Sequence, residues 1–181
     1  MALTVVKTSA LSGNINLTSQ VTGTLPTANG GTGATSFSPG KIKQIVHDVK
    51  SSSSMTTSTS FVTTGMFLAI TPTSASNKIS VQIWSPSYYL SGGGNLQASV
   101  YRGTSGEGSG SDIITSVQGL NSLTGNFYIN GIISFIDSPN STDAQTYTLM
   151  QKSADGSSTG YFESGMGGVA KMQISLTEFS T

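Results

Sequence analysis

Trp84, Tyr88 and Tyr89 form the densest aromatic group of the sequence, with Pro86 between them and three glycines at 92–94 after them. Aromatic rings stack on the apolar faces of sugars, while neighbouring Ser, Asn and Gln side chains supply directional hydrogen bonds. These three residues are therefore candidates for a glycan-binding surface. Aromatic residues of all-β proteins also pack in cores or subunit interfaces, and the sequence favours this second interpretation over glycan contact.

The residue types that catalysis needs are sparse in this chain. His47, beside Asp48, is the single histidine, and nothing marks a serine and an acid that would complete a triad with it. We expect His47 to have a structural role at the surface or an interface; the alternative is a metal ion bound by His47 from three chains on a symmetry axis. The eight acidic residues include no pair that stands out as glycan-cleaving.

Two further classes of site find no support in the sequence. There is no cysteine, which removes disulfide frameworks and thiolate metal sites. The glycines at 30, 31 and 33, and at 106, 108 and 110, match neither the Walker pattern nor a complete dinucleotide fingerprint. We therefore predict no catalytic residue, no metal site and no cofactor, and we expect a protein that is not an enzyme.

The composition predicts an all-β protein with a hydroxyl-rich surface. Ser and Thr account for 56 of the 181 residues and Gly for 22. Ser and Thr compete for backbone hydrogen bonds inside helices, Gly weakens them, and Thr suits a pleated sheet. Charged residues make up only 9%, with eight basic and eight acidic side chains. A chain without net charge does not attract nucleic acid, and its low charge content is typical of a surface covered by other subunits.

Residues 1–40 differ from the rest of the chain. Between Ala10 and Thr35 there is no charged residue, and apolar residues are too widely spaced to form a core. We expect this extended segment to be ordered by partners, with its spaced apolar residues buried around a shared axis: Leu11, Ile15, Leu17, Val21 and Leu25. No signal peptide is expected, because a short apolar stretch is interrupted by Lys7.

Residues 41–181 show the period-two alternation of antiparallel strands, with turn clusters between them. Val62, Met66, Leu68 and Ile70 are predicted to share one face, as are Ile79, Val81 and Ile83, and Met172, Ile174 and Leu176. The strand at 126–136 is apolar on both faces, so it is either central or pressed against a neighbouring subunit. Strands are predicted near 42–49, 61–71, 78–85, 95–102, 112–118, 126–136, 145–152, 160–164 and 169–179. The Ser- and Thr-rich run at 51–60 is predicted to be an exposed connection or a weak edge strand.

The segment from Val21 to Gly33, VTGTLPTANGGTG, closely resembles an element common in bacteriophage tail fibre and virion fibre proteins. Further landmarks resemble head domains of marine and cyanobacterial phage fibres: Thr64-Gly65, Ile70-Thr71-Pro72, Asn77-Lys78-Ile79, Tyr101-Arg102-Gly103 and Phe135-Ile136-Asp137-Ser138-Pro139. The resemblance implies a homotrimer on the virion, made in the host cytoplasm. Residues 1–40 would then form the attachment segment, and residues 41–181 an antiparallel, jelly-roll-like β-sandwich head.

The resemblance leaves two functions open. The head would bind the host cell surface, through a polysaccharide or an outer-membrane protein, with contacts in the loops 86–95, 103–111 and 154–160. Alternatively the chain would be a capsid head fibre or decoration, or an architectural tail protein, that binds no receptor. In both cases residues 1–35 would contact other virion proteins of the tail or capsid.

Overall fold

The computed structural model describes residues 41–51, 54–91, 94–114, 117–123, 127–154, 156, 159–163 and 171–180. For residues 85–91, 94–95, 117–123, 127–130 and 159–163 it describes the backbone only. The predicted attachment segment, with Leu11, Ile15, Leu17, Val21 and Leu25, lies outside the described residues. Residues 40–181 form a compact unit of the chain.

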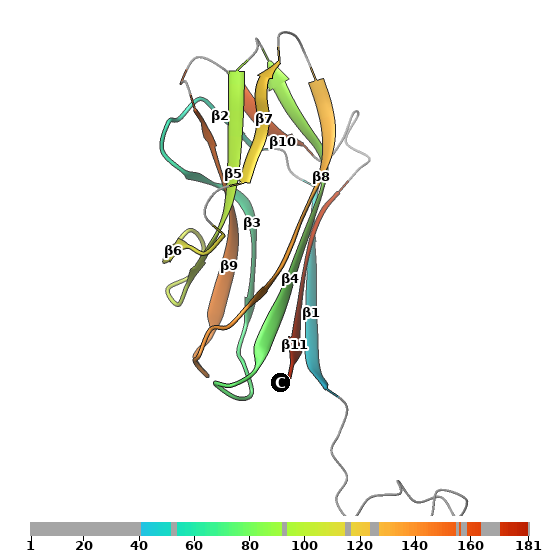
Figure 1. The fold of residues 1–181 in the computed structure, drawn as a ribbon, viewed down its shortest axis with the longest axis vertical. Coiled ribbons are helices and arrows are strands. Elements are labelled where there is room, and N and C mark those ends of the chain that lie inside the picture. The colour runs from blue at the N-terminus through green and yellow to red at the C-terminus, as the bar shows by residue number, and fades with distance from the viewer. Residues whose placement is uncertain are drawn as a thin grey trace, which may run out of the picture. The chain divides into compact units, whose positions relative to one another are not determined.

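The described part of the chain is all-β, with two antiparallel sheets (Figure 1). Sheet A contains β1 (Ile42–Lys50), β11 (Met172–Phe179), β4 (Lys78–Ser91), β10 (Thr159–Glu163), β2 (Ser54–Thr56) and β8 (Phe127–Asp137). Sheet B contains β3 (Val62–Ile70), β9 (Gln145–Ser153), β5 (Gly94–Gly103), β6 (Ser111–Asp112) and β7 (Val117–Leu123). The described residues include no helix that could cross a membrane.

The antiparallel pairs are nested within one another along the chain. β5 pairs with β7, β4 with β8, β3 with β9 and β1 with β11. Each outer pair of these four encloses the inner ones, and from the innermost pair outward they lie alternately in sheet B and sheet A. The short pair of β2 and β10, nested inside β1 and β11, also belongs to sheet A. Sheet A consequently has the neighbours β1, β11, β4 and β8, and sheet B has β3, β9, β5 and β7.

The core lies between the two sheets and confirms the predicted inward faces except at Val62, which is half-buried and is not among the core residues. Met66 and Ile70 of β3 are buried, and Leu68 packs against the same core. Ile79, Val81 and Ile83 of β4 are buried, as are Met172, Ile174 and Leu176 of β11. Sheet B completes the core with residues of β5 and β9: Leu96, Ala98, Val100, Tyr147 and Leu149.

Two predicted strands differ from the structure. β4 continues beyond residue 85 to Ser91, so the predicted loop at 86–95 is in large part strand. Pro86 lies where the register of β4 with β8 shifts, between Ser85 and Tyr88, and a bulge tolerates a residue that has no backbone donor. The predicted strand at 112–118 is replaced by β6 and β7. The run at 51–60 contributes β2, which is an edge strand, as one of the two interpretations predicted.

The apolar strand at 126–136 is β8, and of the two interpretations left open the central position does not hold. Among the described strands, β8 pairs with β4 alone. Ile133 points into the core, whereas Ile132 and Ile136 are 67% and 62% exposed on the opposite face. The sequence showed that both faces are apolar, but it contained no information on which strands lie beside β8.

Glu178 is a buried carboxylate that sequence reasoning missed. It continues the inward alternation of β11 and is fully buried. Its Oε1 accepts hydrogen bonds from the Thr73 backbone N–H at 2.7 Å, the Thr73 hydroxyl at 2.8 Å and Asn77 Nδ2 at 2.6 Å. Its Oε2 accepts from Gln44 Nε2 at 2.6 Å. These bonds tie the 71–77 loop to β1 and β11.

Burial by itself would raise the pKa of Glu178, but the hydrogen bonds from Asn77, Gln44 and Thr73 outweigh it and lower the pKa to about 2. The carboxylate therefore stabilises the fold fully above its ordinary value of 4.5, and this contribution is lost as the pH falls toward 2.

We predict that Glu178→Gln lowers the free energy of unfolding at pH 7 by about 1–3 kcal/mol, because an amide then faces donors that need an acceptor. The difference from wild type should shrink as the pH falls from 4.5 toward 2. Urea unfolding at several pH values measures it. Asp143→Asn, at an exposed loop position, is the control and should change stability by less than about 0.5 kcal/mol. A difference that stays constant with pH would contradict this role.

Candidate interaction surfaces

Trp84 lies on the outer face of sheet A. Because Ile79, Val81 and Ile83 point into the core, the alternation of β4 places Ser80, Gln82 and Trp84 on the other side. Trp84 is half-buried there. The register places it opposite Gln173 of β11 and Ile132 of β8.

Exposed aliphatic side chains lie at both edges of this outer face, while Trp84 and Phe179 lie on its two middle strands. Ile45 and Val49 of β1 are 60% and 37% exposed, and Ile132 and Ile136 of β8 are exposed on the other edge. The two strands between these edges present mostly uncharged polar side chains on this face: Ser80 and Gln82 on β4, and Gln173, Ser175 and Thr177 on β11. His47 is exposed among these residues, as one of the sequence interpretations expected. No described acidic side chain occupies these outward positions of β1, β11, β4 and β8.

Tyr88 and Tyr89 lie in β4 rather than in a loop. The register places Tyr89 directly opposite Tyr161 of β10 and Tyr128 of β8. Tyr88 lies opposite Phe162 and Ile129 in the same way. Sequence reasoning missed Tyr128, Tyr161 and Phe162, because only strand pairing brings these distant segments together. The backbone thus gathers aromatic residues at the end of sheet A that lies beyond Trp84.

The predicted contact loop at 103–111 is held against sheet B. Gly106, Gly108 and Gly110 all have positive φ, which suits glycine and lets the loop turn back. The Gly108 N–H donates to the Thr148 hydroxyl at 2.9 Å, and the Thr63 hydroxyl donates to Glu107 at 2.5 Å. The loop is therefore anchored to β9 and β3.

A second aromatic pair, which sequence reasoning also missed, involves sheet B. The Phe61 and Tyr101 rings have centroids 5.7 Å apart and are tilted by 57°. The Lys152 ammonium lies 4.7 Å from the centroid of the Phe61 ring. Tyr101 is half-buried, and its burial, followed by the charge of Asp112, raises the pKa of its hydroxyl. This cluster is a packed cation–π contact.

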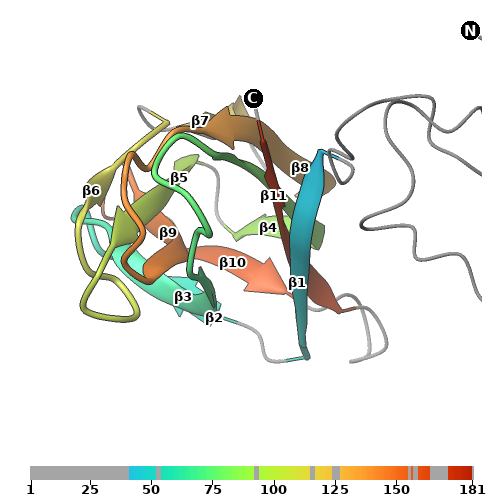
Figure 2. The ribbon, with the colours of Figure 1, turned by 90° about the horizontal axis from the view of Figure 1, so that it is seen from below.

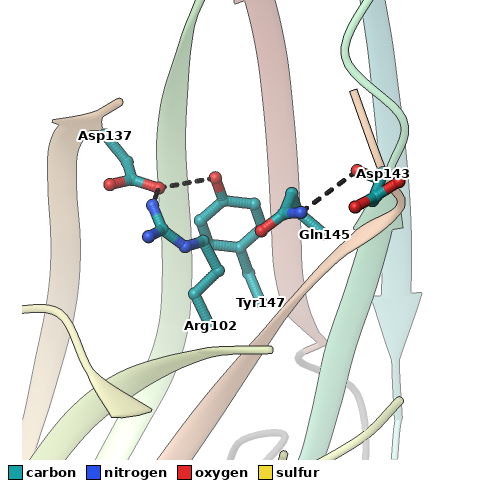
Figure 3. A network of polar contacts seen from close by, with 5 residues as sticks. All are labelled: Arg102, Asp137, Asp143, Gln145 and Tyr147. Atoms are coloured by element: carbon teal, nitrogen blue, oxygen red, sulfur yellow. Dashed lines mark hydrogen bonds and ion pairs between the residues drawn. The ribbon is translucent and has the colours of Figure 1, made fainter. Parts of the chain in front are cut away.

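An ionic cluster joins the two sheets inside the sandwich (Figure 3). Arg102 of β5 forms an ion pair with Asp137, the last residue of β8. The Tyr147 hydroxyl of β9 donates to the same carboxylate at 2.8 Å. Burial, then the hydrogen bond to Asp137, raises the pKa of Tyr147. The hydroxyl therefore stays a donor at all ordinary pH values.

The buried carboxylate of Glu178 and the half-buried carboxylate of Asp137 lie in one cross-strand row. Both Glu178 and Asp137 are opposite Ile79, on either side of it. With strands about 4.8 Å apart, their backbones are about 10 Å from each other. Protein donors already occupy both carboxylates, and Glu178 is fully buried. We interpret the row as structural, since it closes this end of the sandwich with satisfied polar contacts.

The described residues contain no group of three or more His, Cys, Asp or Glu side chains placed to hold a metal ion. No protein-family model and no curated protein sequence matches the chain. The candidate interaction surfaces are the outer face of sheet A and the aromatic rows of β4, β8 and β10 beyond Trp84.

We predict that Arg102→Ala lowers the free energy of unfolding by about 3 kcal/mol, because it leaves the Asp137 carboxylate largely buried without its cation. Chemical denaturation at pH 7 measures the change. Lys43→Ala removes an exposed cation instead and should cost less than about 0.5 kcal/mol. Equal effects of the two substitutions would show that the ion pair adds nothing.

Proposed function

We propose that this chain is a structural fibre protein of a bacteriophage particle. It acts as a homotrimer, is attached to other virion proteins through residues 1–35, and presents residues 41–181 as a head that binds the host cell surface. The observation that carries the proposal is the outer face of sheet A, which bears no described acidic side chain and has exposed isoleucines at both edges. Single exposed apolar residues are ordinary, whereas several of them on one sheet face with few charges favour a subunit interface, because charged residues are depleted at interface cores.

The topology supports an assembly role. Four nested antiparallel pairs distributed over two sheets are the arrangement of a jelly roll, an architecture found in viral capsid and lectin domains. Fold alone does not assign a function. The resemblance of residues 21–33 to a phage fibre element supplies the second, independent argument.

The receptor contact of this proposal lies in the aromatic rows of sheet A. Trp84, Tyr88 and Tyr89 belong to one strand, and Tyr128 and Tyr161 lie opposite Tyr89. Such rows suit a polysaccharide, since each ring offers a flat apolar surface to a sugar. Three copies would bind by avidity even where each site is weak.

The second candidate is a purely architectural protein, either a capsid head fibre or decoration or a tail component. Two observations favour it: the loop at 104–110 is hydrogen-bonded to sheet B, and most of the predicted loop at 86–95 is strand. Fewer free loops leave less variable surface for a receptor.

We predict that the full-length chain has three times the 18.6 kDa mass of one copy when measured by multi-angle light scattering at micromolar concentration. Its melting temperature should fall on dilution, because separated copies expose apolar strand faces. A mass of one chain, with a melting temperature that ignores dilution, would contradict the trimer.

We predict that Tyr88→Ala with Tyr89→Ala abolishes binding of the labelled protein to host bacteria, and that purified surface glycan of those bacteria competes with the wild-type protein. Tyr101→Ala, which removes an aromatic ring associated with sheet B, is the matched control and should bind normally. Wild-type protein that binds no host cell, although it is located on the virion by immunogold labelling, would favour the architectural role. A melting temperature that falls by many degrees in the double variant would instead assign the two tyrosines to packing.

A further inference from the structure

β1 and β8 form the two edges of the four-stranded part of sheet A. In the described residues, β1 pairs with β11 alone and β8 with β4 alone. Seen from the end in Figure 2, β1 lies at the margin of its layer beside β11. An exposed edge strand offers unpaired backbone groups to another chain, and natural proteins usually protect it with charges. The outward positions of these two edges instead carry Ile45, Val49, Ile132 and Ile136.

The register aligns the apolar residues of the two edges. One cross-strand row consists of Ile45, Thr177, Ser80 and Ile136. A second row consists of Val49, Gln173, Trp84 and Ile132. Within one chain the two ends of a row are three strand spacings apart, about 14 Å, so Ile45 and Ile136 do not contact each other.

When a neighbouring copy is generated by rotation about an axis parallel to the strands, each of its cross-strand rows keeps the same position along that axis. A neighbouring copy placed by such a rotation brings its β8 edge to the β1 edge of the first copy. Ile136 then arrives opposite Ile45, Ser134 opposite His47, and Ile132 opposite Val49. Because three successive antiparallel pairings separate β1 from β8, the two edges run antiparallel and can pair as antiparallel strands do.

We propose that the partner of this face is a second copy of the same chain, with the β1 edge of each copy packed against the β8 edge of the next around a threefold axis. The proposal rests on the homotrimer proposed above and assigns its contact residues. The low charge of the face agrees with a second copy as the partner. No described acidic side chain occupies the outward positions, and Lys78 lies only at one end of the face. A cyclic contact joins two different edges, so the β1 edge only has to match the β8 edge.

Cysteine cross-linking tests this geometry directly, because the chain has no cysteine of its own. The double variant Ile45→Cys and Ile136→Cys, made in the full-length chain, should form disulfides only between copies, since the two positions are too far apart within one copy. After mild oxidation, we expect a reducible band of three linked chains on a denaturing gel. Each single variant should run as one chain. Ile45→Cys combined with Thr63→Cys, at an exposed position on β3, is the matched control and should also stay unlinked.

The outcomes separate this inference from the proposed function. A trimer mass by light scattering without cross-linking of the pair would overturn the assigned face and leave the trimer intact. Cross-linking of a single variant into a dimer would indicate a twofold contact and also overturn the proposal. A single-chain mass without cross-linking, as expected if residues 1–40 of the same chain cover the face, would overturn both the face and the trimer.

A charge exchange provides a second test that needs no disulfide geometry. Ile45→Lys and Ile136→Glu should each shift the protein toward single chains, because each buries a lone charge at the contact. The two together should restore the trimer, since the lysine of one copy meets the glutamate of the next. Failure of the double variant to recover, with each single variant dissociated and folded by circular dichroism, would contradict a direct β1 to β8 contact.

Discussion

The hydrogen bonding of β4 along both of its edges is the constraint on which the rest of the sandwich depends. Over its 14 residues β4 pairs with β8 on one side and with β11 and then β10 on the other. This strand therefore fixes the register of three others at once. Its alternation directs Ile79, Val81 and Ile83 into the core and leaves Trp84 outside. A change in its register by one residue would turn every one of these side chains to the wrong face.

The polar row at one end of the sandwich depends on the same register. Asp137 and Glu178 are brought to the two sides of Ile79 by β8 and β11, and each then has to be satisfied inside the protein. The two solutions differ: Glu178 accepts hydrogen bonds from neutral donors, whereas Asp137 is shared between a guanidinium and a phenol. Since a misaligned strand would leave a buried carboxylate unpaired, both contacts penalise alternative registers. The Asp137 contacts also connect the sheets, because Arg102 and Tyr147 belong to sheet B and Asp137 to sheet A.

The outer face of sheet A reverses the usual distribution of apolar residues. Its hydroxyl and amide side chains lie on the middle strands β11 and β4, and its exposed isoleucines lie on the edge strands β1 and β8. Exposed edge strands of other proteins usually carry charges. The low charge content of the whole chain, 9%, agrees with a surface of this kind. The aromatic rows follow further along β4, so this one strand connects the face proposed to contact other copies with the residues proposed to bind a ligand.

Local pattern determined much of this protein: the all-β class, most strands and the inward faces of β3, β4 and β11 follow from composition and period-two alternation, which act over a few residues. Alternation also implied that position 178 of β11 points inward, but a glutamate at that position looks like an ordinary surface residue until its donors are known. Gln44, Thr73 and Asn77 come from other parts of the chain, and only the fold brings them to Glu178. The strand predicted at 78–85 continues to Ser91, because the backbone irregularity between Ser85 and Tyr88 accommodates Pro86, and no local signal in the sequence shows this. The edge position of β8, the row of Tyr161, Tyr89 and Tyr128, and the alignment of Ile45 with Ile136 depend on pairing between distant segments. Such pairing is decided by the packing of the whole domain, and no local sequence signal specifies it.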